Sequence, residues 1–571
     1  MNRRELLALA AGAAAVGATP KPCQAKSPRD AAPSGVHYID DRTGAGPYRR
    51  SQRSNSPNIF LITADMISPD FYLPSRSMSK ELHLPAIHSL MKDGIFFSNA
   101  FCTVPLCAPS RASYLTGRYS YILGNGERAP LGLDSELRPT DTIWPEYLKA
   151  AGYVARHSGK GHVGTKKFID AFGENDHPWN RWSPPIYDDD SYLDYQRRLG
   201  VKPQKYSREI VFLQQDRKTP GNSAGGWIVQ QDGKPFPLEA QYSYYLMQRA
   251  FNELSDLATS PVDRNRPIYY QLDLFDPHQP LSIPEGFEQR EAELRKSITL
   301  PKSYEQVKAH DWRRSEDQPA IYDLYRKYWG LYNAASLREY RIAYALQTEL
   351  VDRIIGVFVD KLKSLGLYEN SLIIFNSDHG EMNGRWAMID KGVYLYPDVL
   401  RVPLVIKPPS TMKVAPRVVQ EPVSLMDIGP TVLSTVGIQP EAKLDGRSLV
   451  PQLKGSATAE DRNLLFFGGW HVGVNFPCGI QQWNPDGSHY LYSYNCTSPV
   501  DELYDLNSVD AENLAQKPEH AALRKQMIDR LGSALQRDPR WTGYWAEFRI
   551  AKYFDLPKTQ GDMQLFGKSS S

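Results

Sequence analysis

The sequence predicts an α/β fold in which helices flank a large central sheet, followed by a smaller C-terminal domain with an antiparallel sheet. Short apolar runs, rich in β-branched and aromatic residues, alternate with helical patterns, and each run ends in a polar residue. Such runs are typical of parallel strands that are buried on both faces of a sheet. Beyond a polar stretch at residues 453–462, the chain shows alternating, strand-like segments, which predict the second sheet.

The predicted central strands are four apolar runs, at residues 58–63, 153–157, 267–272 and 371–375. Polar residues follow these runs in the order Asp65, Lys160 and His162, His278, and then Asp378 and His379. In open α/β sheets, binding sites form where strands end at the carboxyl edge. We therefore expect these polar side chains to meet at one rim of the sheet.

Helices are expected between the strands. Apolar residues at every fourth position predict a long amphipathic helix over residues 342–362, whose role is packing. Residues 174–264 and 283–338 are aromatic and charged without clean periodicity, so we expect them to be insertions around a site rather than core. A last helix is expected near residues 521–535.

Composition narrows the class of protein. The 571 residues include 67 Lys and Arg against 65 Asp and Glu, and the formal charge of +2 offers no basic excess for binding nucleic acid. No apolar run reaches the roughly 18 residues of a spanning helix, so stable membrane insertion is not expected. Five cysteines are too few for a disulfide scaffold. These features indicate a globular protein of the size of an enzyme.

The N-terminus has the layout of an export signal. Arg3 and Arg4 precede a short Ala- and Gly-rich apolar stretch that ends in small residues. This layout is typical of bacterial twin-arginine signals, so we expect the twin-arginine translocation machinery to deliver the protein to the periplasm or outside the cell. A buried N-terminal helix is the alternative, and it is disfavoured because residues 19–53 are rich in Pro, Ser and Arg without periodicity.

The strongest chemical signal is a segment that begins at Cys107 and reads C-x-P-S-R-x-x-x-x-T-G. Pro109 suits a first helical turn and Gly117 suits a helix end, which places Cys107 at a helix N-terminus that favours an anion. Arg111 lies one turn further on and offers a bidentate fork for a tetrahedral oxyanion. The alternatives are a buried structural cysteine and a disulfide between Cys107 and Cys102.

This segment resembles the signature of the sulfatase family, in which the cysteine is converted to formylglycine, whose hydrated aldehyde is the nucleophile. The resemblance extends along nearly the whole chain after the signal, through motifs at residues 57–65, 159–164, 276–278, 377–381, 391, 401–403, 423–427, 444–449 and 502–506. It implies an alkaline-phosphatase-like α/β sandwich. It also implies that a formylglycine-generating enzyme or an anaerobic sulfatase-maturing enzyme modifies Cys107.

The chain is thereby divided into four parts. Residues 1–25 are the predicted twin-arginine signal peptide and residues 26–55 a flexible linker. Residues 56–455 resemble a sulfatase catalytic domain, and residues 456–571 are expected to form a smaller C-terminal α+β domain.

The resemblance implies a metal site formed by Asp65, Cys107, Asp378 and His379. Taken alone, an Asp after a strand is more often a cap, so it is the ordered set of motifs that favours ligands. Most sulfatases carry a second aspartate where this chain has Met66. Relatives with one acidic residue there include choline-sulfatase-like and phosphonate-monoester-hydrolase-like enzymes. Calcium is the expected cation, and the missing carboxylate leaves manganese or magnesium open.

The resemblance also implies roles for the remaining site residues. Arg111 and the metal would hold the hydrated aldehyde, and Lys160 and Lys391 would stabilise charge on the sulfuryl oxygens. His278 would give a proton to the leaving alcohol, and His162 would remove a proton from the second hydroxyl of the aldehyde hydrate.

Three functions were compared. The leading one is an exported sulfatase, a sulfuric ester hydrolase that cleaves a sulfate monoester, with a sulfated glycan suggested by the 33 Tyr and 11 Trp of an exported chain. The runner-up is a phosphonate monoester or phosphodiester hydrolase of the same superfamily, which Met66 favours. The third, a binding protein without chemistry, is favoured by no residue.

Two other features have no predicted part in the chemistry. His157, close to the site residues in sequence, is interpreted as structural. Cys478 and Cys496 lie in the smaller domain, where a disulfide would suit an oxidising compartment, but sequence spacing does not decide whether they pair.

Overall fold

The structure of the chain is a computed structural model. It describes residues 56–541 except 121–136, 139, 174–188, 203, 208–211, 223–226, 231, 457–461, 470, 473–474, 476 and 496–497. The predicted signal peptide, the predicted linker and Cys496 therefore lie outside the described residues.

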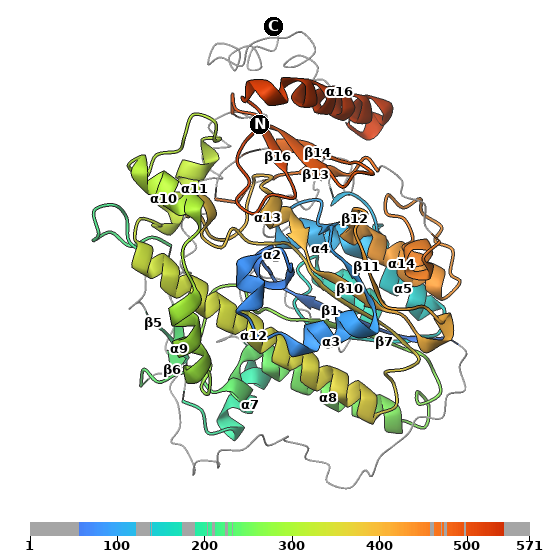
Figure 1. Ribbon diagram of the computed structural model, residues 1–571. Coiled ribbons are helices and arrows are strands. Elements are labelled where there is room, and N and C mark those ends of the chain that lie inside the picture. The colour runs from blue at the N-terminus through green and yellow to red at the C-terminus, as the bar shows by residue number, and fades with distance from the viewer. Residues whose placement is uncertain are drawn as a thin grey trace, which may run out of the picture.

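A seven-stranded mixed sheet forms the centre of the molecule (Figure 1). Its strands, in spatial order, are β11 (Arg417–Val419), β2 (Ile95–Phe97), β10 (Leu404–Lys407), β8 (Ser371–Ser377), β1 (Asn58–Ala64), β7 (Ile268–Asp273) and β4 (Val154–Gly159). The four predicted strands are the neighbours β8, β1, β7 and β4, and they run parallel to one another. The prediction of a large central sheet is confirmed, while β10, antiparallel to β8, was not expected.

The register of these strands brings their carboxyl ends to one edge. Thr63 lies opposite Asp273, Ala64 lies opposite Ser377, and Gly159 lies opposite Asp273 from the other side. All residues of β1, β7 and β8 are buried, as expected for strands covered on both faces. The polar residues that follow the strands are therefore brought to the same rim.

Helices cover both faces of the sheet (Figure 1). The longest, α12 (Ala334–Ser364), contains the predicted helix over residues 342–362 and begins after Asn333, whose side chain accepts two backbone hydrogen bonds. It packs with α3 (Pro85–Asp93), α8 (Tyr242–Thr259) and α9 (Glu288–Ser297). A second group consists of α4 (Cys107–Thr116), α5 (Trp144–Ala150), α6 (Thr165–Phe172) and α14 (Ile428–Thr435). No helix in the described ranges is long and apolar enough to cross a bilayer.

The expectation that residues 174–264 lie outside the core is wrong for α8. This helix packs against β4 and α12, and most of its side chains are buried. Because it is buried on several faces, with tyrosines among the buried positions, its apolar residues do not repeat with a clean helical period. Besides α8 and the start of α12, the described parts of the two predicted insertions contain short elements: α7 (Asp190–Arg198), β5 (Gln204–Ser207), β6 (Trp227–Gln230), η4 (Leu238–Ala240), α9, α10 (Lys302–Ala309) and α11 (Ile321–Trp329).

Short elements link the sheet to the site. A three-stranded sheet is formed by β12 (Val423–Ser424), β3 (Ala100–Phe101) and β9 (Arg401–Val402). The remaining short helices of this part are α2 (Pro69–Tyr72), η1 (Ser77–Lys80), η5 (Arg385–Ala387), α13 (Pro397–Leu400), η6 (Ser410–Met412), η7 (Leu425–Asp427) and α15 (Val450–Lys454).

The C-terminal part contains the smaller antiparallel sheet that the sequence predicts. Its strands are β13 (Leu465–Phe467), β14 (Pro477–Trp483), β15 (His489–Asn495) and β16 (Glu502–Asp505), followed by η8 (Pro518–His520), α16 (Ala521–Arg537) and η9 (Pro539–Trp541). Phe101 makes edge contacts with Phe466 and His489, and the N–H of Phe467 donates to the carbonyl of Thr103. The small sheet thus packs on the segment that leads into Cys107.

Candidate active site

Four side chains from three segments converge at the carboxyl edge of the sheet. Ligand-type atoms of Asp65, Cys107, Asp378 and His379 all lie within 4.8 Å of one another, and all four residues are buried. The Cys107 Sγ lies 3.2 Å from His379 Nε2 and 3.8 Å from Asp65 Oδ1. The structure therefore brings together the four residues that the sequence proposes as metal ligands.

The chemistry of this donor set fits a divalent cation. Burial and repulsion by the neighbouring Asp65 raise the pKa of Asp378. A cation between the two carboxylates would relieve this repulsion. His379 Nδ1 lies 3.0 Å from the Gly380 carbonyl, which can only accept, so Nδ1 donates and Nε2 faces the cluster, where a cation could replace its proton. Without a cation, burial is outweighed by Asp378 and Cys107, which raise the pKa of His379 to about 9. Two carboxylates, an imidazole and residue 107 are a ligand set that a divalent ion accepts.

Cys107 is the first residue of α4, as the sequence predicts. Gly117 closes the helix in the left-handed conformation, at φ 66°. Burial opposes ionisation of the thiol, but Lys160, Lys391 and His379 together hold the pKa of Cys107 well below its usual range. Cys102 and Cys107 carry free thiols, so the alternative of a disulfide between them is wrong. The position of residue 107 favours a negatively charged or strongly polarised group.

Arg111 contacts three of the segments that end at this edge of the sheet. Its Nε donates to Asp378 Oδ2 at 2.8 Å, and its Nη1 donates to the Lys160 carbonyl at 2.7 Å. Nη1 also lies 3.6 Å from Asp273 Oδ1. Within the described part of the chain, only Nη2 of this guanidinium has no hydrogen-bond partner. The fork expected to face an oxyanion thus binds mostly protein groups, with one nitrogen left for a ligand.

Lys160 and His162 follow β4 at the same edge. Lys160 Nζ donates to Asp65 Oδ2 and lies 5.6 Å from the centre of the Phe275 ring. His162 is hydrogen-bonded to Cys107, and burial lowers the pKa of His162, which keeps the imidazole neutral. His162 also has a positive φ of 58°, a conformation that non-glycine residues adopt at some energetic cost.

His278 and Lys391 form a second pair in the site. Lys391 Nζ contacts His278 Nε2, and His278 Nδ1 lies 2.7 Å from the Gln279 carbonyl. Because that carbonyl can only accept, Nδ1 donates to it, and Nε2 of the neutral ring accepts from Lys391. Burial opposes the charge of Lys391, but Asp390, 3.0 Å away, raises the pKa of Lys391 overall.

Two carboxylates behind the site were not predicted. Asp273, the last residue of β7, lies 3.1 Å from His157 Nε2 and accepts from Gln271 Nε2 at 2.6 Å, so His157 is connected to the site through Asp273. Glu381 accepts hydrogen bonds from the N–H groups of Asn383 and Asp390, and burial raises the pKa of Glu381 to about 8. The position of Asp273 at the end of a predicted strand was the available signal.

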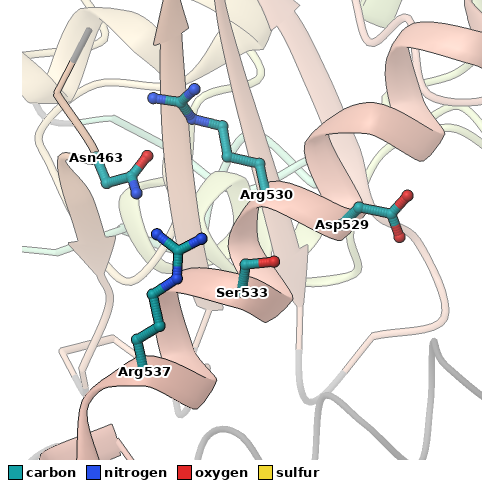
Figure 2. Close-up of a pocket in the computed structure, with 5 residues that line it drawn as sticks. All are labelled: Asn463, Asp529, Arg530, Ser533 and Arg537. Carbon is teal, nitrogen blue, oxygen red and sulfur yellow. The ribbon is translucent and has the colours of Figure 1, made fainter.

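A separate cavity of about 410 Å³ lies on the C-terminal helix α16. Figure 2 shows its lining residues, which are Asn463, Asp529, Arg530, Ser533 and Arg537. The Asp529 carboxylate points away from the two arginines in this view. None of these residues belongs to the converging cluster, so the cavity is not the candidate active site.

Comparison with known proteins agrees with this geometry. Residues 57–438 match the family model described as Sulfatase. The chain belongs to the sulfatase family. A second model, described as N-sulphoglucosamine sulphohydrolase, C-terminal, matches residues 384–537 of this sulfatase. The enzyme is accordingly a sulfuric ester hydrolase.

Relatives cover most of the sulfatase. Arylsulfatase K of Bos taurus is 24% identical over 493 residues, which are 81% of this chain and 79% of that protein. An arylsulfatase of Clostridium perfringens is 26% identical over 523 residues, or 88% and 98% of the two chains. The phosphonate monoester hydrolase of Agrobacterium radiobacter superposes with a TM-score of 0.63 at 21% identity, covering 84% of this chain and 95% of that one. This likeness confirms the predicted α/β fold, with its large central sheet and a smaller antiparallel sheet.

Proposed function

We propose that the sulfatase hydrolyses a sulfate monoester of a glycan to the alcohol and sulfate, using formylglycine derived from Cys107 as nucleophile and one divalent cation. The observation that carries the proposal is the convergence of Asp65, Cys107, Asp378 and His379 within 4.8 Å. Three positively charged groups of the surrounding protein, on Arg111, Lys160 and Lys391, suit a substrate with a negatively charged ester group.

Asp65, Asp378, His379 and residue 107 would hold the cation, which would polarise the ester as a Lewis acid. Calcium is the expected ion. Manganese and magnesium are the alternatives, because Met66 is buried where most sulfatases carry a further carboxylate and its thioether is a poor ligand for a hard ion.

Residue 107 is the position of the nucleophile, and its Sγ stands for the oxygen that the modified residue presents. His162 is hydrogen-bonded to this atom and its lowered pKa keeps the imidazole neutral. A neutral imidazole in that position removes a proton from the atom it contacts. His162 is therefore the proposed general base.

His278 is proposed to give the proton to the leaving alcohol. Its Nε2 contacts Lys391 Nζ, and the raised pKa of Lys391 keeps the ammonium protonated at this place. Lys391 is proposed to stay charged beside the leaving oxygen rather than to transfer its own proton. Lys160 and Lys391 also stabilise negative charge on the sulfuryl oxygens.

A glycan substrate is supported by the second family model, whose description names a sulphohydrolase of a sulphated amino sugar. A phosphonate monoester hydrolase is the alternative function, because Met66 leaves one carboxylate fewer beside the cation and a phosphonate monoester hydrolase shares the fold. The mapped lysines and histidines favour the sulfate ester.

Export by the twin-arginine translocation machinery to the periplasm or outside the cell remains part of the proposal. It rests on Arg3, Arg4 and the apolar stretch after them. A formylglycine-generating enzyme or an anaerobic sulfatase-maturing enzyme is the proposed partner that modifies Cys107.

Mass spectrometry of one peptide tests the nucleophile. Cleavage after Lys92 and Arg111 releases residues 93–111, which carry both Cys102 and Cys107. When the enzyme is coexpressed with a maturation enzyme, we expect an aldehyde at Cys107, while Cys102, a free buried thiol in the same peptide, stays unchanged. An active enzyme that carries only thiols in this peptide would refute the proposed mechanism.

A further inference from the structure

A histidine from the C-terminal part of the chain lies beside the segment that carries Lys391. His471, between β13 and β14, is half-buried, and its Nδ1 lies 3.0 Å from the hydroxyl of Tyr325 on α11. The same hydroxyl accepts from the N–H of Val393, at 3.3 Å, two residues beyond Lys391. The connection between the two strands is thereby attached to the active-site segment.

A second contact and a close approach strengthen this attachment. Asn475 Nδ2 donates to the Val393 carbonyl at 2.8 Å. At Gly392, a Cβ atom would lie only 2.0 Å from the Tyr325 hydroxyl, so the hydroxyl is seated directly against the backbone next to Lys391. Tyr325 is itself fully buried and packs edge-on against Tyr394, with the ring centres 5.0 Å apart. The position of His471 relative to Lys391 is therefore well defined.

Tyr325 also determines which nitrogen of His471 carries the proton. Its hydroxyl accepts from the N–H groups of Val393 and Val472, so its own hydrogen is donated to His471 Nδ1. A neutral imidazole with an accepting Nδ1 has its hydrogen on Nε2. No residue in the described ranges accepts a hydrogen bond from this Nε2.

Burial keeps His471 neutral, and its link through Tyr325 to Val393 places it beside the segment of Lys391. Burial lowers the pKa of His471 to about 4, and the charges of Asp390, Lys391, Cys107 and His278 all affect it. The catalytic groups around Cys107 are fully buried, whereas His471 retains partial exposure. His471 is thus more exposed than the charged groups around Cys107 and offers a neutral donor.

We infer that His471 is a substrate-binding residue whose Nε2–H donates a hydrogen bond to a hydroxyl or ring oxygen of the sugar that carries the sulfate, with Tyr325 as its positioning residue. The inference rests on the proposed function and names the part of the substrate that the small sheet recognises. A neutral donor matches a neutral sugar oxygen, while the anionic sulfate is matched by the lysines deeper in the site. The aryl group of an aryl sulfate has no sugar hydroxyl or ring oxygen, so it cannot accept this hydrogen bond in the same way.

The test compares two substrates on matured enzyme. One is the monosaccharide sulfate that the unaltered enzyme turns over fastest from a panel, and the other is 4-nitrophenyl sulfate. We expect His471→Ala to lower kcat/KM for the monosaccharide sulfate by at least about tenfold more than for 4-nitrophenyl sulfate, the loss typical of a hydrogen bond in a buried site. His471→Gln, which keeps a donor, should recover part of this difference.

Tyr325→Phe tests whether Tyr325 acts by positioning His471 or only by supporting the fold. We expect it to shift the ratio of the two kcat/KM values in the same direction, and to cause no further shift of that ratio in the His471→Ala background. His88→Gln, at an exposed histidine of α3, is the matched control and should leave both values unchanged.

The outcomes are distinguishable. An active enzyme in which His471→Ala lowers both kcat/KM values equally, or neither, would overturn the role of His471 and leave the proposed function standing. An unaltered enzyme with a verified aldehyde that hydrolyses no sulfate ester would overturn both.

Discussion

Asp378 connects three parts of the active site through one carboxylate. Its Oδ2 accepts from Arg111 Nε at 2.8 Å, and its Oδ1 accepts from the N–H groups of Met66 and His379 at 3.2 Å and 3.0 Å. The segment after β1, helix α4 and the segment after β8 are thus held together at the proposed metal site. The proposed role of Asp378 as a metal ligand and its role as a hydrogen-bond acceptor use the same two oxygens.

Asp378→Asn is therefore expected to abolish metal binding and turnover together. The amide removes the charge and brings an N–H₂ group against Arg111 Nε or the backbone donors. We expect bound metal to fall below stoichiometry and kcat to fall by at least about 100-fold. Elemental analysis and steady-state kinetics on the folded variant measure both quantities. Asp360→Asn, at an exposed carboxylate of α12, is the control, and stoichiometric metal with full activity in Asp378→Asn would refute the ligand assignment.

The sequence predicted which residues belong to the candidate site, but it did not predict the hydrogen bonds and ion pairs between them. Cys107 at the start of a helix and Asp378 after a strand follow from local patterns of Pro, Gly and apolar residues. The binding of Arg111 to the Lys160 carbonyl and to Asp273 does not, because it depends on how three distant segments meet. His471 was missed because its place in the site is created by packing of the small sheet.

Among the secondary-structure elements, β4 shows most clearly how a backbone position determines the site. Gly159, its last residue, has a φ of 115°, and a Cβ atom there would lie 1.9 Å from the carbonyl oxygen of Asp273. The next residue, Lys160, donates its backbone N–H to the same carbonyl at 3.1 Å. Only glycine allows β4 to approach β7 this closely while Lys160 is directed into the site.

Gly159→Ala is expected to destabilise the protein by about 3 kcal/mol or more, because it adds a backbone clash to an unfavourable φ. Gly152→Ala is the matched control: its φ is also positive, at 89°, but no atom lies within 4 Å of the added Cβ, so its cost should be about 1 kcal/mol. Urea denaturation measures both free energies of unfolding. Equal losses in the two variants would show that the close approach at Gly159 does not exist.

The elements were predictable where a pattern was repeated along the chain. The four apolar runs predicted β1, β4, β7 and β8 correctly, and apolar residues at every fourth position predicted most of α12. Helix α8 was not predicted because it is buried on several faces and has no single apolar stripe. Strand β10 was not predicted because only four of its residues pair, and its antiparallel direction depends on tertiary packing.

At the scale of the whole molecule, the predicted export signal lies outside the described residues and stays a prediction. Arg3→Lys combined with Arg4→Lys should retain the precursor in the cytoplasm, because the twin-arginine pathway recognises the arginine pair. Fractionation of cells that express the full chain, with detection of precursor and processed protein, measures this. Lys21→Arg, a conservative change beyond the apolar stretch, is the control, and an unchanged periplasmic yield of the double variant would mean that another pathway exports the protein.

The small C-terminal sheet has a defined relation to the rest of the chain. It packs on the segment before Cys107 through Phe466 and Phe467, and it reaches the Lys391 segment through His471 and Asn475. This arrangement could not be predicted from sequence, because alternating strands indicate a sheet but not the surface that it covers. It connects the part of the chain beyond residue 455 to residue 107, the proposed nucleophile, and to the segment that carries Lys391.

The relative activity toward sulfate and phosphonate esters tests the proposed function most directly. Met66 leaves one carboxylate fewer than in most sulfatases, whereas Lys160, His162, His278 and Lys391 lie in motifs that resemble those of sulfatases. The measurement is kcat/KM of matured enzyme, with the aldehyde at residue 107 verified, for 4-nitrophenyl sulfate and for the matching aryl phosphonate monoester. We predict a higher kcat/KM for the sulfate, and a preference for the phosphonate of more than about tenfold, or about 1.4 kcal/mol in transition-state stabilisation, would contradict the account.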